Sequence, residues 1–151
     1  MTDEACSRRE FLKKFARLSG GALMLSATAI ACDPLPNVLP SIIGIYCYDA
    51  AMQKIELRGN NAVPVHTQFE FVFSTDMDIT WPADVAFVDL NGTPVGFTEG
   101  WFDARTLILT PFADLSFNTD YLLTVKDADD AHGNPLNDYA NASAAFRTAS
   151  A

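Results

Sequence analysis

The side chains best suited to chemistry lie in the acidic stretch DADDAHGNPLND, Asp127 to Asp138. Carboxylate and amide oxygens are the ligands that calcium prefers, so this stretch is a candidate calcium site. The candidate ligands are Asp127, Asp129, Asp130 and Asn134. Asp76 and Asp78 can join them only if their loop lies at the same end of the molecule. The spacing is not that of an EF-hand loop, and Asp, Asn and Gly also form turns readily, so a solvated turn is the alternative interpretation.

The remaining residues offer little for catalysis. The chain has two histidines, His66 and His132, and it has neither a G-x-S-x-G motif nor a zinc-ligand pattern. These histidines are, with Met52 and Met77, the ligands available to copper, but none of the four has ligand spacing. We therefore expect no enzyme and no cofactor, with calcium as the one exception to test.

Cys47 lies between two tyrosines in an apolar run, with no histidine near it in sequence. A small buried apolar residue is the simplest interpretation of such a cysteine. A disulfide between Cys47 and Cys32 is the alternative in an oxidising compartment. Sequence spacing does not decide between the two, because it does not give the separation of the Cα atoms.

Charge is unevenly distributed along the chain. The formal net charge is −9, but residues 1–31 contain five basic and three acidic side chains, which leaves −11 for residues 32–151. An acidic body repels phosphate, so we expect no nucleic-acid partner. Anionic lipid repels it as well, so attachment to a membrane requires a dedicated anchor.

Residues 1–31 have the organisation of an export signal. A basic segment precedes the apolar run Leu18–Ala31, which is shorter than the ~20 residues that span a bilayer and contains two adjacent glycines. The stretch SRREFLK resembles the twin-arginine export motif S-R-R-x-F-L-K, and its defining positions are held by Arg8, Arg9, Phe11 and Leu12. That resemblance implies recognition by the twin-arginine export machinery, which moves folded proteins across the cytoplasmic membrane.

The end of this signal, AIAC, resembles a lipobox, which implies cleavage and lipidation of Cys32. The same residues satisfy the A-x-A rule of ordinary signal peptidase, so simple cleavage before Cys32 is the alternative. Both interpretations remove residues 1–31. Residues 32–40 contain three prolines, which predict an extended tether, or an edge strand broken by prolines.

Residues 41–150 are expected to form one domain, because their apolar side chains alternate along short runs, as in strands with one buried face. The residues expected to face the core are Phe69, Phe71, Phe73, Leu107, Leu109, Tyr121, Leu123, Val125 and Phe146. Turn signals at Asn91-Gly92 and at HGNP, His132 to Pro135, separate the runs. Short strands and turns predict an all-β fold, an Ig-like antiparallel β-sandwich of about seven strands after a cleaved N-terminal signal.

Aromatic residues refine this expectation. Tyr121 follows Leu115 and a polar bend, the pattern of a tyrosine corner, in which the ring is buried and the hydroxyl bonds to backbone upstream. Trp81, Trp101 and Phe102 can belong to the core or to the surface. Core burial is the default, and Trp101 is the candidate for exposed contact with a partner.

Five stretches together resemble the SbsA-type bacterial Ig-like domain, a module named for surface-layer proteins. They are AVPVHTQFEFVFSTDMD (62–78), NGTPV (91–95), RTLILTPFADLSFNTDYLLTVKD (105–127), HGNPL (132–136) and AFRT (145–148). Their order and spacing agree with the family pattern across most of residues 62–148, whereas YDAAMQKIELRGNNAV is longer than the usual link between the first two strands. The resemblance implies a sandwich outside the cytoplasm and supplies no catalytic residues.

The sequence therefore predicts a non-catalytic module of the periplasm or cell surface, anchored by lipid on Cys32. Its expected partners are other envelope proteins or polysaccharide. Edge strands, exposed aromatics near Trp101 and the acidic loops are the expected contact surfaces. A periplasmic calcium-binding protein is the alternative function, and an enzyme is a distant third.

Overall fold

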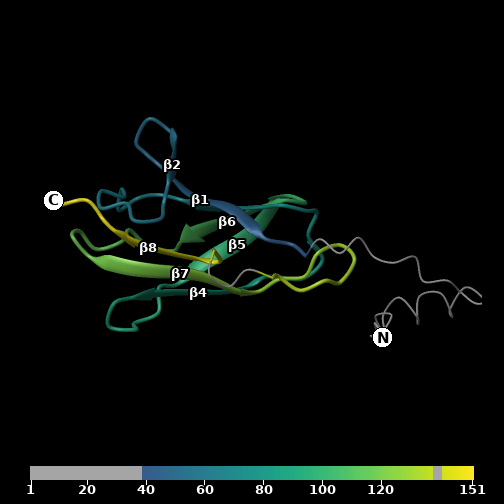
Figure 1. Cartoon of the computed structure of the whole chain (residues 1–151). Helices are drawn as coiled ribbons and strands as arrows, with labels where there is room; N and C mark the ends of the chain where they lie inside the picture. Colours follow the sequence, from purple (N-terminus) through teal and green to yellow (C-terminus); the bar gives the residue numbers. More distant parts are fainter. Residues whose placement is uncertain (1–38, 138–140) are drawn as a thin grey trace, which may run out of the picture. The chain divides into compact units, whose positions relative to one another are not determined.

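The computed structural model describes residues 39–137 and 141–151, which form two antiparallel β-sheets packed face to face (Figure 1). Their strands are β1 (Ile42–Tyr48), β2 (Lys54–Glu56), β3 (Phe69–Phe73), β4 (Asp84–Asp89), β5 (Phe97–Asp103), β6 (Thr106–Pro111), β7 (Asp120–Asp127) and β8 (Ser143–Arg147). One sheet has the order β2-β1-β3-β6-β5, and the other has the order β4-β7-β8. The all-β antiparallel sandwich predicted from the sequence is confirmed.

The described residues contain eight strands rather than about seven, because the chain turns back after β1 to form the short strand β2. β2 pairs with the end of β1, where Tyr46 is opposite Glu56 and Tyr48 is opposite Lys54. The additional strand uses the stretch that is longer than the usual family link. That stretch is therefore structured as a hairpin and not as a simple connection.

Alternation along the strands sorts side chains between the core and the outer surface. In β3, Phe69, Phe71 and Phe73 are at most 1% exposed, while Glu70 and Val72 point to the outer face. The same alternation buries Leu107, Leu109, Tyr121, Leu123, Val125 and Phe146 in β6, β7 and β8. Every core position predicted from the period-two pattern is confirmed.

Aromatic rings from both sheets meet in the core. The Phe69 ring of the five-stranded sheet lies 5.4 Å from the Phe87 ring and 5.3 Å from the Phe146 ring, both of the three-stranded sheet. Tyr121 completes the cluster, with its ring 5.7 Å from Phe87 and 5.6 Å from Phe146. Edge and offset arrangements at these separations add to the free energy of burial, so the cluster ties one layer to the other.

The tyrosine corner predicted at Tyr121 is confirmed. Its side chain is 5% exposed, and its hydroxyl oxygen accepts a hydrogen bond from the backbone N–H of Ser116 at 3.0 Å. Thr148, which is 1% exposed, donates to the Ser116 carbonyl at 2.6 Å and accepts from the backbone N–H of Thr119 at 2.9 Å. The polar atoms of the bend before β7 are thereby satisfied from inside the fold.

The three aromatics of uncertain place divide between core and surface. Trp101 is half-buried on β5, with its ring 5.4 Å from the Phe73 ring, and its Nε1 donates to the Trp81 carbonyl at 3.3 Å. Trp81 and Phe102 are 60% and 78% exposed. The default expectation of core burial thus holds for Trp101 and is wrong for Trp81 and Phe102, which form the exposed aromatic surface here.

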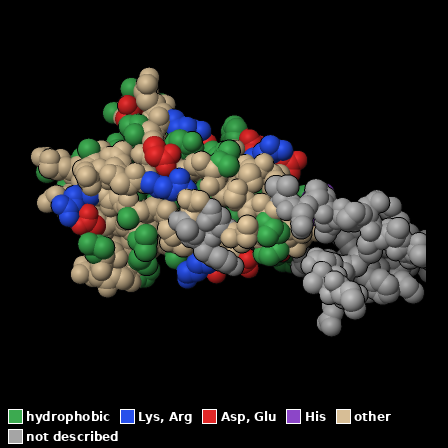
Figure 2. Space-filling model, in the orientation of Figure 1, with side chains coloured by type: hydrophobic (Ala, Val, Ile, Leu, Met, Phe, Trp, Pro, Cys, Tyr) green, Lys and Arg blue, Asp and Glu red, His purple; other side chains and the backbone are tan. Residues whose placement is uncertain are grey.

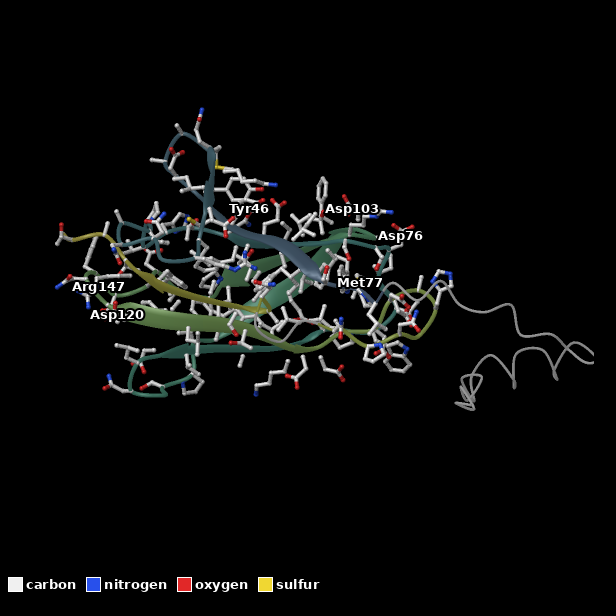
Figure 3. All side chains as sticks on the ribbon, viewed as in Figure 1. Tyr46, Asp76, Met77, Asp103, Asp120 and Arg147 are labelled. Carbon is white, nitrogen blue, oxygen red and sulfur yellow. The ribbon has the colours of Figure 1, made fainter. Side chains whose placement is uncertain are left out.

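Different contacts are found at the two ends of the sandwich. Pro40, the last residue of the expected tether, is buried and accepts a hydrogen bond from the backbone N–H of Asn137 at 2.9 Å, so the fold includes it. Figure 3 shows Asp76, Met77 and Asp103 near this end, and Asp120 with Arg147 at the other. The guanidinium of Arg147 binds both carboxylate oxygens of Asp120 and lowers the pKa of that carboxyl.

The predicted signal and lipidation residues lie outside the described part of the chain: Arg8, Arg9, Phe11, Leu12 and Cys32. The same holds for most of the expected tether. Within residues 39–137 and 141–151, no helix has the length and apolar character needed to cross a bilayer.

Replacing Tyr121 with Phe leaves the Ser116 N–H without its partner in a partly buried bend. We expect the free energy of unfolding to fall by about 1–2 kcal/mol, measured by equilibrium urea denaturation. The control is Tyr46→Phe on the outer face, expected to change it by less than about 0.5 kcal/mol. Equal losses in the two variants would contradict the corner's role.

Candidate functional site

Three turns in the described residues share one hydrogen-bond pattern built on an aspartate. They are Asp49–Gln53, Asp89–Thr93 and Asp130–Asn134. In each, the aspartate Oδ1 accepts from the backbone N–H groups two and four residues later, at 2.8–2.9 Å. The N–H three residues later donates to the aspartate carbonyl at 2.9–3.0 Å. The aspartates thus close these turns, and the Thr93 N–H, above all, lowers the pKa of Asp89.

The fourth residue of each turn has a positive φ, which favours glycine. Gly92 at +79° and Gly133 at +85° meet this requirement, whereas the remaining turn has Met52 at +59°. A residue with a Cβ costs about 1–2 kcal/mol more in this left-handed region. The fold therefore holds Met52 in an unfavourable conformation, with its side chain 73% exposed.

Met52 lies on the wall of an open pocket of about 310 Å³. The lining residues come from the segments 48–52, 65–68 and 110–114. Because β3 runs antiparallel to both β1 and β6, its beginning lies beside their ends, and this pairing assembles the pocket. The volume is at the lower end of the range of small-molecule sites, which begins at about 300 Å³.

Hydrogen bonds across the three segments fix the pocket walls. The Thr67 hydroxyl donates to the Tyr48 carbonyl at 2.9 Å and accepts from the Tyr48 N–H at 3.0 Å. Gln68 Nε2 donates to the Thr110 hydroxyl at 3.1 Å. The Leu115 N–H donates to the Val65 carbonyl at 2.9 Å and closes the rim.

A histidine and an aspartate form a pair on the exposed rim. His66 Nδ1 lies 2.7 Å from Asp114 Oδ1, and the two side chains are 91% and 64% exposed. The contact uses Nδ1, so Nε2 is the ring nitrogen that a ligand can reach. The pair therefore presents an oriented imidazole beside a carboxylate.

Phe112 forms an exposed aromatic wall of the same pocket. Its side chain is 71% exposed, and its N–H donates to the Gly96 carbonyl at 3.0 Å. A Cβ added at Gly96 would lie 2.7 Å from the Phe112 ring, so only glycine leaves room for the ring at this place.

A buried carboxylate next to the pocket joins β1, β2 and β3 on the outer face. Glu70 is 5% exposed, and it accepts a 2.5 Å hydrogen bond from Lys54 Nζ and another from the Tyr48 hydroxyl. Lys54 Nζ also lies 4.7 Å from the centre of the Tyr46 ring. Buried charges require such partners. The bond to Glu70, with burial, raises the pKa of Tyr48 to about 12, and the cluster fixes this pocket residue in place.

The predicted calcium ligands lie at the other end of the sandwich. The Asp78 N–H donates to the Asp129 carbonyl at 2.9 Å, and the Ala131 N–H donates to the Asp76 carbonyl at 2.9 Å. The two acidic loops therefore lie together, which is the condition that the calcium hypothesis set.

Within these loops, Asp130 is 3% exposed and its carboxylate is bonded inside its own turn, including a 2.9 Å bond from Asn134 Nδ2 to Oδ2. Asp127 is exposed at the end of β7, and Asp129 is exposed beside it. Among the described residues, no group of three or more His, Cys, Asp or Glu side chains is arranged to hold a metal ion. The calcium site stays a prediction, and the observed bonds give Asp130 a role in the turn.

The copper-type ligands separate into two places. Met52 and His66 both line the pocket. Met77 is 2% exposed and pairs with Asp130, and His132 lies in the same acidic loop at the other end. Cys47 is a free, fully buried thiol on β1, and burial raises its pKa to about 11, as suits a residue that packs in the core.

The pocket is the site that sequence reasoning missed. His66 and Asp114 are 48 positions apart, and no local sequence pattern predicts their pairing. One signal was readable: the turns DLNGT and DAHGN have glycine in fourth place, whereas DAAMQ has Met52 there.

Comparison with known proteins agrees with the fold. A family model described as bacterial Ig-like domain matches residues 57–148, so β1 and β2 precede the matched region. No curated protein matches the chain.

Two solved structures of the S-layer protein SbsC share the fold. The structure of rSbsC(31-844) has 11% identity and a TM-score of 0.50, and that of its N-terminal part has 12% identity and a TM-score of 0.51. Each covers 74% of this chain, which spans 14% and 24% of those chains. CopC from Methylosinus trichosporium OB3b aligns with 14% identity and a TM-score of 0.47, over 70% of this chain and 93% of CopC.

The Tyr48–Glu70 bond gives a prediction about pH. Because the folded-state pKa of Tyr48 is raised above its ordinary value, the bond contributes stability below about pH 10 and loses it as the pH rises through about 12. We expect Tyr48 to remain protonated at about pH 11. The measurement is the phenolate absorbance of the native chain minus that of Tyr48→Phe, and this difference should be close to zero at that pH. Glu70→Gln should move the titration back toward about pH 10, and an unmoved titration would contradict the assignment.

A calcium site and a hydrogen-bonded turn predict different effects of replacing Asp130 on stability. On its hydrogen bonds alone, Asp130→Ala should lower the free energy of unfolding by about 2 kcal/mol, equally in calcium and in chelator. The exposed Asp127→Ala is the control, with a change below about 0.5 kcal/mol. Thermal melting in both buffers is the measurement, and a loss that appears only in calcium would instead establish the metal site.

Proposed function

The chain belongs to the bacterial Ig-like domain family, and from that membership we propose that it is a non-catalytic module of the cell envelope that contacts other envelope proteins or polysaccharide. The proposal includes export by the twin-arginine route, guided by Arg8 and Arg9, and a lipid anchor on Cys32. The family membership supports the module, and the leader sequence supports the route and the anchor.

The hydrogen bonds made by the pocket hydroxyls favour a binding function over a catalytic one. His66 and Asp114 have the spacing of a base and its orienting carboxylate, which nucleophilic catalysis uses. A nucleophile must then lie within hydrogen-bond reach of the imidazole. The pocket hydroxyls are instead engaged elsewhere: Tyr48 with Glu70, Thr67 with the Tyr48 backbone, and Thr110 with Gln68. This arrangement suits recognition of a ligand.

The position of the pocket fits a module held at a surface. The chain enters the fold at Pro40, beside the acidic loops, and β1 then runs to Tyr48 at the pocket. A strand of this length spans about 20 Å. A module attached through residue 40 therefore has its pocket at the end of β1 opposite the attachment point.

Charge supports a dedicated anchor over direct adsorption to lipid. The described residues include fourteen acidic and five basic side chains. On the face drawn in Figure 2, the basic side chains stand next to acidic ones. Anionic lipid headgroups would repel such a surface, which supports a lipid on Cys32 as the proposed attachment over direct adsorption.

Export is tested by cell fractionation with intact mass measurement of the protein. We expect the native chain in the envelope fraction, cleaved before Cys32 and carrying acyl chains. Replacing Arg8 and Arg9 together with Lys should leave the uncleaved chain in the cytoplasm, while Lys14→Arg, the control outside the motif, should not. Cys32→Ser should remove the acyl mass. Export of the double variant would refute the twin-arginine route, and a native chain found in the cytoplasm would refute the envelope proposal.

A further inference from the structure

We propose that the pocket beside Met52 receives an arginine or lysine side chain from an exposed segment of a partner protein. This inference rests on the proposed function and names the chemistry of the partner. It follows from three properties of the pocket walls: their charge, their exposed apolar groups and the strained residue among them.

The charge of the walls selects a cation. Asp49 and Asp114 line the pocket, and its segments 48–52, 65–68 and 110–114 contain no lysine or arginine. Each carboxylate uses Oδ1 in a bond within the protein, to backbone N–H groups in Asp49 and to His66 in Asp114. The nearby Lys54 ammonium is paired with Glu70. An acidic glycan or peptide would be repelled, and a guanidinium or ammonium attracted.

The apolar walls suit the stem of such a side chain. Met52 and Phe112 are 73% and 71% exposed, among the most exposed large apolar side chains described. Lys and Arg carry three or four methylene groups that pack on apolar surface while the charged head stays in a polar one. Phe112 also offers a ring face to a cation, and Gly96 leaves the ring the space to lie there. A charged head and an apolar stem together match this combination of walls.

The conformation of Met52 is the third property. The two sister turns have glycine at this position, and glycine would relieve the strain here as well. A methionine kept at a position that penalises it points to a use for its side chain. Its flexible thioether adapts to a partner surface, as methionines do at binding sites.

The test titrates the isotope-labelled full chain with the peptide acetyl-Gly-Arg-Gly-Arg-Gly-amide and follows backbone amide shifts. We expect shifts confined to residues 48–53, 65–68 and 110–114, and weaker binding at higher salt. Asp114→Asn should weaken binding about fivefold, and Phe112→Ala about threefold. Asp127→Asn, which removes the same charge at the other end of the sandwich, should leave binding unchanged. Met52→Gly should weaken binding while raising the midpoint of urea unfolding.

Two further probes test whether the pocket binds an acidic peptide or a neutral sugar instead of a cationic side chain. The same peptide with Glu in place of Arg and the neutral disaccharide chitobiose are both expected to leave the pocket shifts unmoved. Chitobiose shifts in the pocket without arginine shifts would overturn the cationic occupant and leave the envelope binding module standing. Equal binding of the Glu peptide, equal weakening by Asp127→Asn, or no shift with any probe would also overturn it. Envelope fractionation decides the proposed function separately, because it does not depend on the pocket.

Discussion

Burial of four aromatic rings between the sheets is the interaction on which the rest of the structure depends. Phe69 comes from one sheet, and Phe87, Phe146 and Tyr121 come from the other, with neighbouring rings 5.3–6.2 Å apart. Each ring is placed by strand alternation, so a shift of one residue in register would turn the rings outward. The same register brings the beginning of β3 beside the ends of β1 and β6, and the pocket exists because that core is formed.

The fold was largely readable from the sequence because its signals are local. Period-two alternation identified the buried residues of β3, β6, β7 and β8, and the spacing of Leu115 and Tyr121 identified the tyrosine corner. The pocket was not readable, since it depends on contacts between distant segments. The buried Glu70 shows the same limit: its partners Tyr48 and Lys54 come from a hairpin that precedes the region matched by the family model. Asp130 had an ambiguous signal, because good turn formers and calcium ligands are the same residue types.

The hairpin of β1 and β2 lies before the region matched by the family model and contributes to the pocket. Its second strand, β2, is the edge strand of the five-stranded sheet, and the ion pair of Lys54 with Glu70 joins β2 to β3 on the outer face. Its turn repeats a hydrogen-bond pattern found at two other places in the described residues, but with Met52 where the others have glycine. The hairpin thus supplies one wall of a site whose other walls belong to the region matched by the family model.

The placement of Pro40 and the pocket at opposite ends of β1 has a mechanical consequence. A pull applied at Pro40 and resisted at the pocket acts along the axis of β1, which is paired with β3 on one side and β2 on the other. Inter-strand hydrogen bonds in antiparallel sheets lie perpendicular to the strands. The load is then shared by the whole row of bonds in shear, and the bonds do not open one after another. A tensile force along this line is borne by the bonds to β3 along most of β1, and β2 adds its bonds at Tyr46–Tyr48.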